Sequence, residues 1–301
     1  MKQKVLFVLG PTGIGKSSLA VKLAKKYNME IISADSVQVY KEFNIGSAKV
    51  TEEEMEGVKH YGIDILSPEE TFSASEFVEY TKNKIEEILS IGKIPLIVGG
   101  TGLYVKSLVE GYNFGGTDRH EKFRAQLEKL ASSQGLVALY DKLKCVAPEV
   151  ADKIDRNNKV RLIRALEIAT YGSKKSASEV DYDFLTIALT MPRELLYENI
   201  NKRAQIMVEN GLIEETKMLY EKYKNCQALG AIGYKETVSY LKGEISKQDM
   251  LTLISQHTRN YAKRQLTFLR SLDYVKYFDK TEEGYLNKIE KEIEQWIQKS
   301  N

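Results

Sequence analysis

The feature that most restricts the fold of this chain is an apolar run that leads directly into a glycine-rich segment. The run KVLFVL is followed by GPTGIGKSSLA, residues 10–20, after which the sequence becomes helical. Gly10, Gly15, Lys16 and Ser17 match the pattern G-x-x-x-x-G-K-[ST], with a strand expected before it and a helix after it. Glycines let the backbone turn tightly, so that successive N–H groups and the helix N-terminus face one anion. The pattern therefore predicts a site for a di- or triphosphate.

Further short apolar runs predict the remaining strands of a parallel sheet. Helical stretches separate them, among them residues 75–91, for which Thr71 or Ser73 is the expected cap. This alternation favours an α/β fold, a doubly wound parallel sheet of the P-loop NTPase type. The expected strands are residues 5–9, 30–33, 94–98, 184–189 and 274–278.

From about residue 116 to residue 182 the pattern changes to charged helix without a strand signal. We interpret this stretch as a helical insertion domain. Residues 1–115 then form the first part of the α/β core, and residues 183–301 complete the core and add C-terminal helices.

Composition excludes several other classes. The formal net charge is +2, so a polyanionic partner would have to be held by local basic clusters rather than by the global field. Cys145 and Cys226 belong to no CxxC pattern, which argues against a disulfide framework and a structural zinc site. No apolar run approaches the roughly 20 residues that span a bilayer. We expect a cytoplasmic protein with no membrane partner.

The sequence after the strand at 30–33 carries an acid, Asp35, in IISADSVQVY. Open α/β sheets bind ligands at the carboxyl ends of their strands, where this acid should lie. A nucleotide hydrolase or kinase would usually show a later apolar strand ending in Asp. The strand in KIPLIVGGTGLY ends instead in Gly99, Gly100 and Thr101. Because the phosphate loop recognises phosphates and not bases, a pyrophosphate ester without a nucleoside is compatible with it.

At this point the motifs resemble those of the tRNA dimethylallyltransferases, also called tRNA isopentenyltransferases. GPTGIGKSSLA, ISADSVQVYKEFNIGSAK, HYGIDILSPEETFSASEF and IPLIVGGTGLYVKSLVEG resemble the family's motifs in order. DRNNKVRLIRALEI, IGYKETVSYLKGEIS and RNYAKRQLTFLR extend the likeness over nearly the whole chain. A phosphate loop alone says little about substrate, whereas this ordered set is highly specific.

The resemblance implies transfer of a dimethylallyl group from dimethylallyl diphosphate to the exocyclic N6 amine of an adenine in tRNA. That adenine is 3′-adjacent to the anticodon, and diphosphate is released. The resemblance also implies a P-loop α/β domain with a helical insertion. We expect Mg²⁺ as cofactor, the tRNA anticodon stem-loop as partner, and a monomer.

The same resemblance assigns roles to individual residues. Asp35 is the expected general base, Thr101 orients the adenine amine, and Lys16 stabilises the leaving group. Ser17 is the expected metal ligand. Lys217 lies where some members have arginine, and a lysine cannot form arginine's bidentate contact. The full set expected to bind diphosphate is Gly10, Pro11, Thr12, Gly13, Ile14, Gly15, Lys16, Ser17 and Lys217.

The residues expected to contact tRNA form a strand-end segment and two basic helix stripes. Each has a simpler alternative: Asp35 and Thr101 as caps or metal neighbours, Gln38 as a surface residue, and the charges as solvated helix faces. Tyr40 and Tyr104 either receive the extracted adenine or belong to the core. The expected tRNA contacts are Asp35, Ser36, Val37, Gln38, Thr101, Phe123, Arg124, Lys159, Val160, Arg161, Leu162, Ile163, Arg164, Arg259 and Lys263.

Two other functions compete with prenyl transfer. A small-molecule or nucleotide kinase with a helical lid would use the same loop for ATP, with Asp35 activating a hydroxyl. An RNA-binding protein with a vestigial phosphate loop would need no acid at Asp35. The motifs after Asp35 and the late basic stripe favour the transferase.

Overall fold

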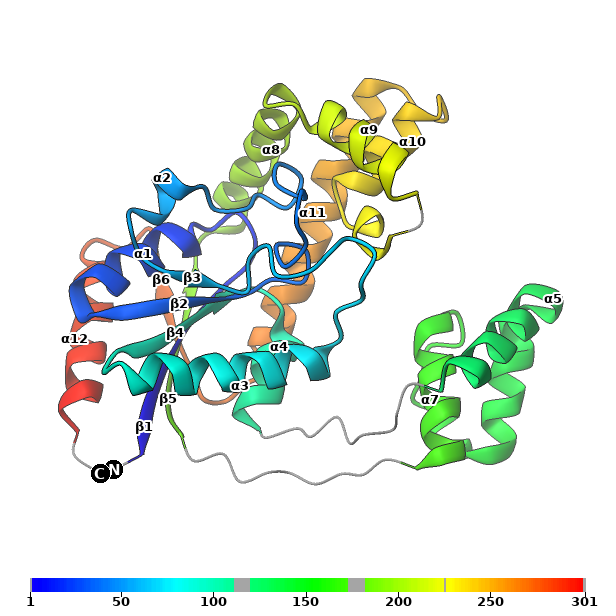
Figure 1. Ribbon diagram of the computed structural model, residues 1–301, viewed down its shortest axis with the longest axis horizontal. Coiled ribbons are helices and arrows are strands. Elements are labelled where there is room, and N and C mark those ends of the chain that lie inside the picture. Colours follow the sequence, from blue (N-terminus) through cyan, green and yellow to red (C-terminus); the bar gives the residue numbers. More distant parts are fainter. Residues whose placement is uncertain (1, 111–119, 173–181, 225, 300–301) are drawn as a thin grey trace. The chain divides into compact units, whose positions relative to one another are not determined.

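The computed structural model describes residues 2–110, 120–172, 182–224 and 226–299. Internal contacts divide the chain into two compact units, Met1–Lys106 with Asp181–Asn301, and Ser107–Val180. Figure 1 colours both along the sequence. The second unit overlaps the proposed insertion of residues 116–182, but its boundary falls earlier, at Ser107. The expected boundary residues 115 and 116 lie outside the described residues.

A parallel sheet forms the centre of the first unit. Within the described residues it has six strands, in the order β3-β2-β4-β1-β5-β6. The predicted α/β fold is confirmed, and the ends of the expected strands lie within two residues of the observed ones. β3 was not predicted, because two residues are too few for a periodic signal. The strands are β1 Gln3–Leu9, β2 Met29–Ala34, β3 His60–Tyr61, β4 Ile94–Gly99, β5 Tyr182–Thr190 and β6 Val275–Asp279.

Helices surround this sheet and continue beyond it. Among the described residues, no helix is both long and apolar enough to cross a membrane. The helices outside the insertion are α1 Lys16–Tyr27, α2 Glu52–Met55, α3 Ala74–Ser90, α4 Gly102–Val109, α8 Arg193–Glu209, α9 Leu212–Lys222, η1 Gln227–Gly230, α10 Tyr234–Leu241, α11 Lys247–Leu269 and α12 Tyr285–Gln298.

Both faces of the sheet are covered, as its buried strands require. On one face, Leu19 of α1 and Ile293 of α12 pack in one cluster with Leu6 of β1. α3 contacts β2 and β4, and it begins after Ser73, whose hydroxyl forms a capping box with Glu76. Of the two expected caps, Thr71 and Ser73, the structure therefore has Ser73, whose hydroxyl accepts the N–H of Glu76.

The helices α8 to α11 pack on the loop that follows β2, residues 35–49. Tyr40 and Phe43 of this loop are buried in one cluster with Leu212 of α9, Tyr234 of α10 and Ile254 of α11. The ring centroids of Phe43 and Tyr234 are 4.9 Å apart. Through this apolar contact, helices from the last third of the chain lie at the carboxyl end of β2 (Figure 1).

The second unit is helical, with α5 Glu121–Val146, α6 Pro148–Ala151 and α7 Lys159–Tyr171. α5 is broken at Gly135, whose φ of 78° is left-handed and favours glycine. Leu139 of α5 and Leu166 of α7 are buried in the core of this unit. Its described part therefore has a hydrophobic core of its own.

Candidate active site

The loop between β1 and α1 has the geometry of an anion site. Gly13 and Gly15 have φ values of 83° and 90°, which side chains other than glycine rarely adopt. Gly15 is also the N-cap of α1, and no side chain caps this helix. The N-terminal end of α1, with its partial positive charge, therefore faces the loop and is not neutralised by a capping side chain.

Lys16 turns back over this loop. Its Nζ donates to the carbonyl oxygen of Pro11 at 2.9 Å. Desolvation by burial, together with the positive charge of Arg203, lowers the pKa of Lys16 to about 8, and Asp35 opposes the shift. A bound anion would favour the charged form of this lysine.

Arg203 of α8 is the second cation of the site, and sequence reasoning missed it. Its Nη1 donates to Oγ1 of Thr12 at 3.3 Å. Burial lowers the pKa of its guanidinium, and the charge of Asp35 opposes this. The sequence did contain a signal for it, because Arg203 lies at helical spacing on the same face of α8 as Leu196 and Ile200, which are both buried. A charged residue on an apolar helix face needs a partner, which the phosphate loop provides here.

Two further side chains from distant segments fix the loop, and neither was predicted. Gln265 of α11 accepts the Thr12 N–H at 2.9 Å and donates to the Gly100 carbonyl at 3.0 Å. A Cβ at Gly100 would lie 2.0 Å from Nε2 of Gln265, so this close approach requires glycine. Lys280, after β6, donates to the Ile14 carbonyl at 3.0 Å. The loop is therefore held from three directions.

Asp35 follows the carboxyl end of β2, as expected. Its Oδ1 accepts the N–H groups of Val37 at 2.8 Å and Gln38 at 3.2 Å. The carboxylate thus caps the turn that follows β2, which was the simpler interpretation of this residue. It also lines both cavities of the site, so capping does not remove it from the surface available to a ligand.

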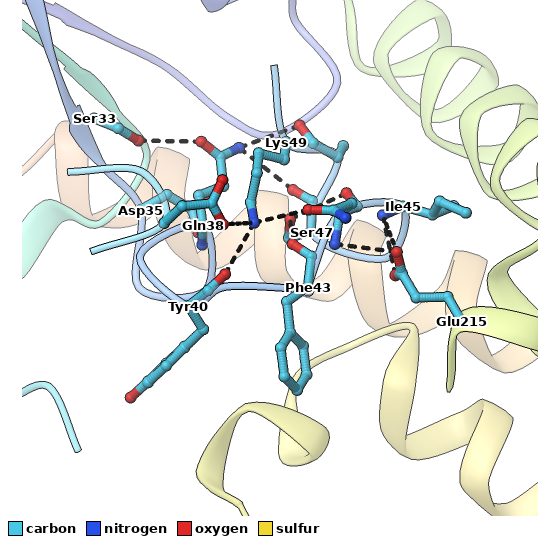
Figure 2. Close-up of polar contacts among 12 residues, drawn as sticks. Ser33, Asp35, Gln38, Tyr40, Phe43, Ile45, Ser47, Lys49 and Glu215 are labelled. Carbon is cyan, nitrogen blue, oxygen red and sulfur yellow. Dashed lines mark hydrogen bonds and ion pairs between the residues drawn. The ribbon is translucent and has the colours of Figure 1, made fainter. Parts of the chain in front are cut away.

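Gln38 has its side-chain amide engaged inside the loop, as Figure 2 shows. Its Oε1 accepts the Ser33 hydroxyl at 3.1 Å, and its Nε2 donates to the carbonyls of Ser47 and Ala48 at 3.4 and 3.2 Å. The expected tRNA contact from this side chain would have to replace these bonds. In the structure these hydrogen bonds of Gln38 stabilise the loop.

The side chains of Thr101 and Tyr261 lie within hydrogen-bonding distance of each other. Burial and the charge of Asp35 raise the pKa of Tyr261, while hydrogen bonding with the side chains of Thr101 and Gln265 opposes the rise. Tyr40 and Tyr104 are both buried, and the Tyr104 ring stacks on Phe77 at 4.0 Å. Of the two interpretations for these tyrosines, the structure therefore supports core packing.

Two cavities open around these groups, with volumes of about 340 and 390 Å³. The larger one also contains Lys16 and Ser17. The smaller one has apolar lining from Ile200, Met207 and Ile254, and a further cation, Arg264, which was not predicted. The residues common to both cavities are Thr12, Gly13, Asp35, Ser47, Arg203 and Tyr261.

The site suits a magnesium ion held together with a phosphate ligand. No three His, Cys, Asp or Glu side chains form a metal-binding cluster in the described ranges. Mg²⁺ commonly keeps several waters and binds one or two protein oxygens plus substrate phosphates. Ser17 is exposed in the first turn of α1 and offers such a hydroxyl oxygen.

Three of the expected contacts in the first unit lie outside the lining of the two cavities. Lys217 is exposed on α9 and lines neither cavity, so Arg203 is the cation that reaches the phosphate loop. Arg259 donates to Oδ1 of Asn201 at 2.6 Å. Lys263 is exposed on α11.

In the second unit the expected contacts separate into exposed and structural residues. Lys159, Val160 and Arg161 are exposed on the first turn of α7. Leu162 and Ile163 are buried in the hydrophobic core, because their side chains face α5, and Phe123 packs against that core. The side chains of Leu162 and Ile163 are therefore unavailable to RNA, whereas that of Phe123 is only partly buried.

Arg124 and Arg164, also expected at the RNA, share the fully buried carboxylate of Glu167 at 2.7 and 2.6 Å. Hydrogen bonding from Arg124 is the main cause that lowers the pKa of Glu167 to about 2. This ion pair joins α5 to α7. Both arginines thus neutralise a buried carboxylate, a structural role that the sequence did not reveal.

Comparison with known proteins agrees with this geometry. A family model described as IPP transferase matches residues 38–272. A tRNA dimethylallyltransferase of Bacillus anthracis is 45% identical over 309 residues, covering 100% of this chain and 98% of the relative. The chain belongs to the IPP transferase family.

Solved structures extend the likeness from sequence to fold. The full-length tRNA isopentenylpyrophosphate transferase of Bacillus halodurans is 41% identical, with a TM-score of 0.76 over 99% of this chain and 97% of that one. A eukaryotic dimethylallyltransferase acting on tRNA is 28% identical, with a TM-score of 0.78 over 97% of this chain and 78% of that one. The family that the motifs predicted is confirmed, and with it the assignment to the transferases.

Proposed function

We propose that this member of the IPP transferase family prenylates tRNA. It transfers the dimethylallyl group of dimethylallyl diphosphate to N6 of the adenine 3′-adjacent to the anticodon. The observation that carries the proposal is the shared lining of the two cavities. Thr12 and Gly13 of the phosphate loop, the Arg203 guanidinium and the Asp35 carboxylate surround the same space.

The leaving group is stabilised by positive charge and by backbone N–H groups. In the reaction the allylic C1–O bond breaks, and its electron pair leaves with the diphosphate. Lys16, Arg203 and the N-terminus of α1 are the groups that meet the developing negative charge. Ser17 is the residue that would hold Mg²⁺ here, and the ion would supply further charge neutralisation when bound.

The prenyl chain fits the apolar part of the smaller cavity. Ile200, Ala204, Met207 and Ile254 line this part, next to Arg203. A five-carbon chain is apolar, and burial of each CH₂ contributes about 0.8 kcal/mol. A donor with its diphosphate on the phosphate loop therefore gains binding energy by placing its chain there.

The acceptor amine approaches from the side of Asp35. N6 forms the new bond to C1, and its proton passes to the carboxylate. An aromatic amine is a poor nucleophile, so removal of this proton during bond formation is worth roughly 10²- to 10⁴-fold in rate. The adenine must first leave its stack, which costs a few kcal/mol. Thr101, paired with Tyr261, is the residue that orients its edge.

Exposed residues of both units are the proposed contacts for the rest of the tRNA. Lys263 on α11, and Lys159 and Arg161 on α7, are exposed. Lysine and arginine contacts to phosphates position an RNA without reading its sequence. The two arginines that pair with Glu167 are not among these proposed contacts.

The decisive experiment is incubation with unmodified tRNA, Mg²⁺ and labelled dimethylallyl diphosphate, followed by analysis of the nucleosides. We expect label on a single adenosine beside the anticodon. Asp35→Asn is the informative variant, because an amide oxygen can still accept the N–H groups of Val37 and Gln38. It should lose at least 10²-fold in turnover and still bind the donor. Turnover at the wild-type rate would exclude Asp35 as the base, and stabilisation by ATP rather than diphosphate would favour a kinase.

A further inference from the structure

The loop at residues 35–49 carries the proposed base and one wall of the smaller cavity. Ser36, Val37, Gly46 and Ser47 belong to that wall. The loop has no helix and only an isolated bridge between Tyr40 and Leu66. Its shape must therefore be fixed by side chains rather than by regular secondary structure.

One carboxylate, that of Glu215 on α9, binds the centre of this loop. The backbone N–H groups of Asn44, Ile45 and Gly46 all donate to it, at 2.9 to 3.1 Å. Successive N–H groups that converge in this way form a concave site for an anion. Figure 2 shows Glu215 reaching Ile45 and its neighbours from the adjacent helix.

The hydrogen bonds continue from this turn to Asp35. The carbonyls of Ser47 and Ala48, which follow the turn, accept from Nε2 of Gln38. The backbone N–H of Gln38 in turn donates to Oδ1 of Asp35 at 3.2 Å. A displacement of the 44–46 turn would therefore reach the carboxylate of Asp35 through Gln38.

Glu215 also joins the loop to the opposite wall of the cavity. The Tyr234 hydroxyl donates to its Oε1 at 2.7 Å. Tyr234 begins α10, directly after Gly230, Ala231, Ile232 and Gly233, which line the smaller cavity. The contact is tight, since a Cβ at Gly46 would lie 2.5 Å from Cζ of Tyr234. One carboxylate thus sets the spacing of the two walls.

We propose that Glu215 is a positioning residue for the transfer step, which holds the turn at residues 44–46 and through Gln38 orients Asp35. Glu215 lines neither cavity, so this role does not require contact with either substrate. The inference rests on the proposed function of Asp35 as the base. A positioning role can be told apart from a general stabilising role, because the diphosphate site is built from other elements, namely residues 10–16, α8 and α11. A loss of positioning should leave that site intact.

The test compares Glu215→Gln with Glu214→Gln. The amide keeps one acceptor oxygen but replaces the other with a donor, so some of the loop bonds are lost. Glu214 is the next residue of α9 and is exposed, so its replacement makes the same charge change without touching the loop. We expect Glu215→Gln to lower kcat with tRNA roughly 10- to 100-fold, the effect of a misplacement near 1 Å. Affinity for inorganic diphosphate, which has no prenyl chain to place in the smaller cavity, should stay within about twofold, because the phosphate loop is not displaced.

A second measurement is independent of the reaction. Hydrogen exchange of the backbone amides at residues 37–48, with no substrate present, should accelerate in Glu215→Gln and stay at the wild-type rate in Glu214→Gln. Accelerated exchange with an unchanged kcat would overturn the positioning role, and so would equal losses in kcat and in affinity for inorganic diphosphate. If the wild-type protein itself transfers no prenyl group, the proposed function fails, while the exchange result still decides whether Glu215 anchors the loop.

Discussion

Raising the pH from 7 to 9 should weaken diphosphate binding, because the ammonium of Lys16 titrates in this range. Burial and Arg203 lower the pKa of Lys16 in the free protein to about 8. A bound diphosphate favours the charged lysine and raises that pKa again, so binding takes up a proton wherever the free lysine is neutral. The affinity is fully present only below about pH 7, decreases as the pH rises through 8, and is about tenfold lower at pH 9, as the protonated fraction falls.

Calorimetry measures this proton directly. Binding of a non-transferable thiolodiphosphate analogue, titrated in two buffers of different ionisation enthalpy, gives the number of protons taken up. We expect close to zero at pH 6.5 and roughly 0.9 at pH 9, from a pKa of about 8. The variant Arg203→Gln removes the neighbouring positive charge, so the rise in proton uptake should move to higher pH while the affinity decreases overall.

Lys16→Met is the matched control, since it has no group to titrate and should show no uptake at either pH. Uptake that is the same at pH 6.5 and pH 9 in the wild-type protein would refute the reasoning. It would mean that Lys16 is already fully charged in the free loop, in spite of its burial.

Four further changes test other parts of the structure. Glu167→Gln should lower the stability of the second unit by about 2–3 kcal/mol at pH 7. The pKa of Glu167 is depressed from 4.5 to about 2. Its contribution to stability is therefore fully present above pH 4.5 and disappears as the pH falls through 2. Denaturant melts at pH 7 and pH 3 should show the stability difference between wild type and Glu167→Gln becoming smaller at the lower pH. Gly46→Ala should cost about 1–3 kcal/mol in a melt of the whole protein, because the added Cβ overlaps the Tyr234 ring. Arg161→Ala should weaken tRNA binding and reduce its salt dependence without changing the melt, whereas Arg164→Ala should lower the melting temperature through its lost pair with Glu167.

Much of the fold was predictable because its signals are local. The runs that became β1, β2, β4 and β5 are short and apolar, and a strand buried on both faces needs nothing else. The signal for β6 was weaker, because it is an edge strand with no fully buried residue. The phosphate loop was equally visible, since its glycines are required by local backbone angles at Gly13 and Gly15. The family resemblance was local too, because it consists of motifs in sequence order.

The insertion shows where a local pattern stops being informative. The segment NKVRLIRALE has basic and apolar residues at helical spacing, which predicted an amphipathic RNA-binding helix. Only the packed unit reveals that Glu167 is buried and pairs with Arg164 of this segment and with Arg124 of α5. Helical spacing tells which residues share a face, but not which face the neighbouring helix covers.

The sequence by itself therefore determined the sheet, the phosphate loop and the acid at the end of β2. The tertiary structure alone decided which distant side chains complete the site: Arg203, Gln265 and Lys280 on the phosphate loop, and Glu215 on the loop after β2. Gln265 lies 253 positions from Thr12, whose N–H it accepts. No short-range pattern links such residues, because their meeting depends on how α8, α9 and α11 pack on the carboxyl end of the sheet.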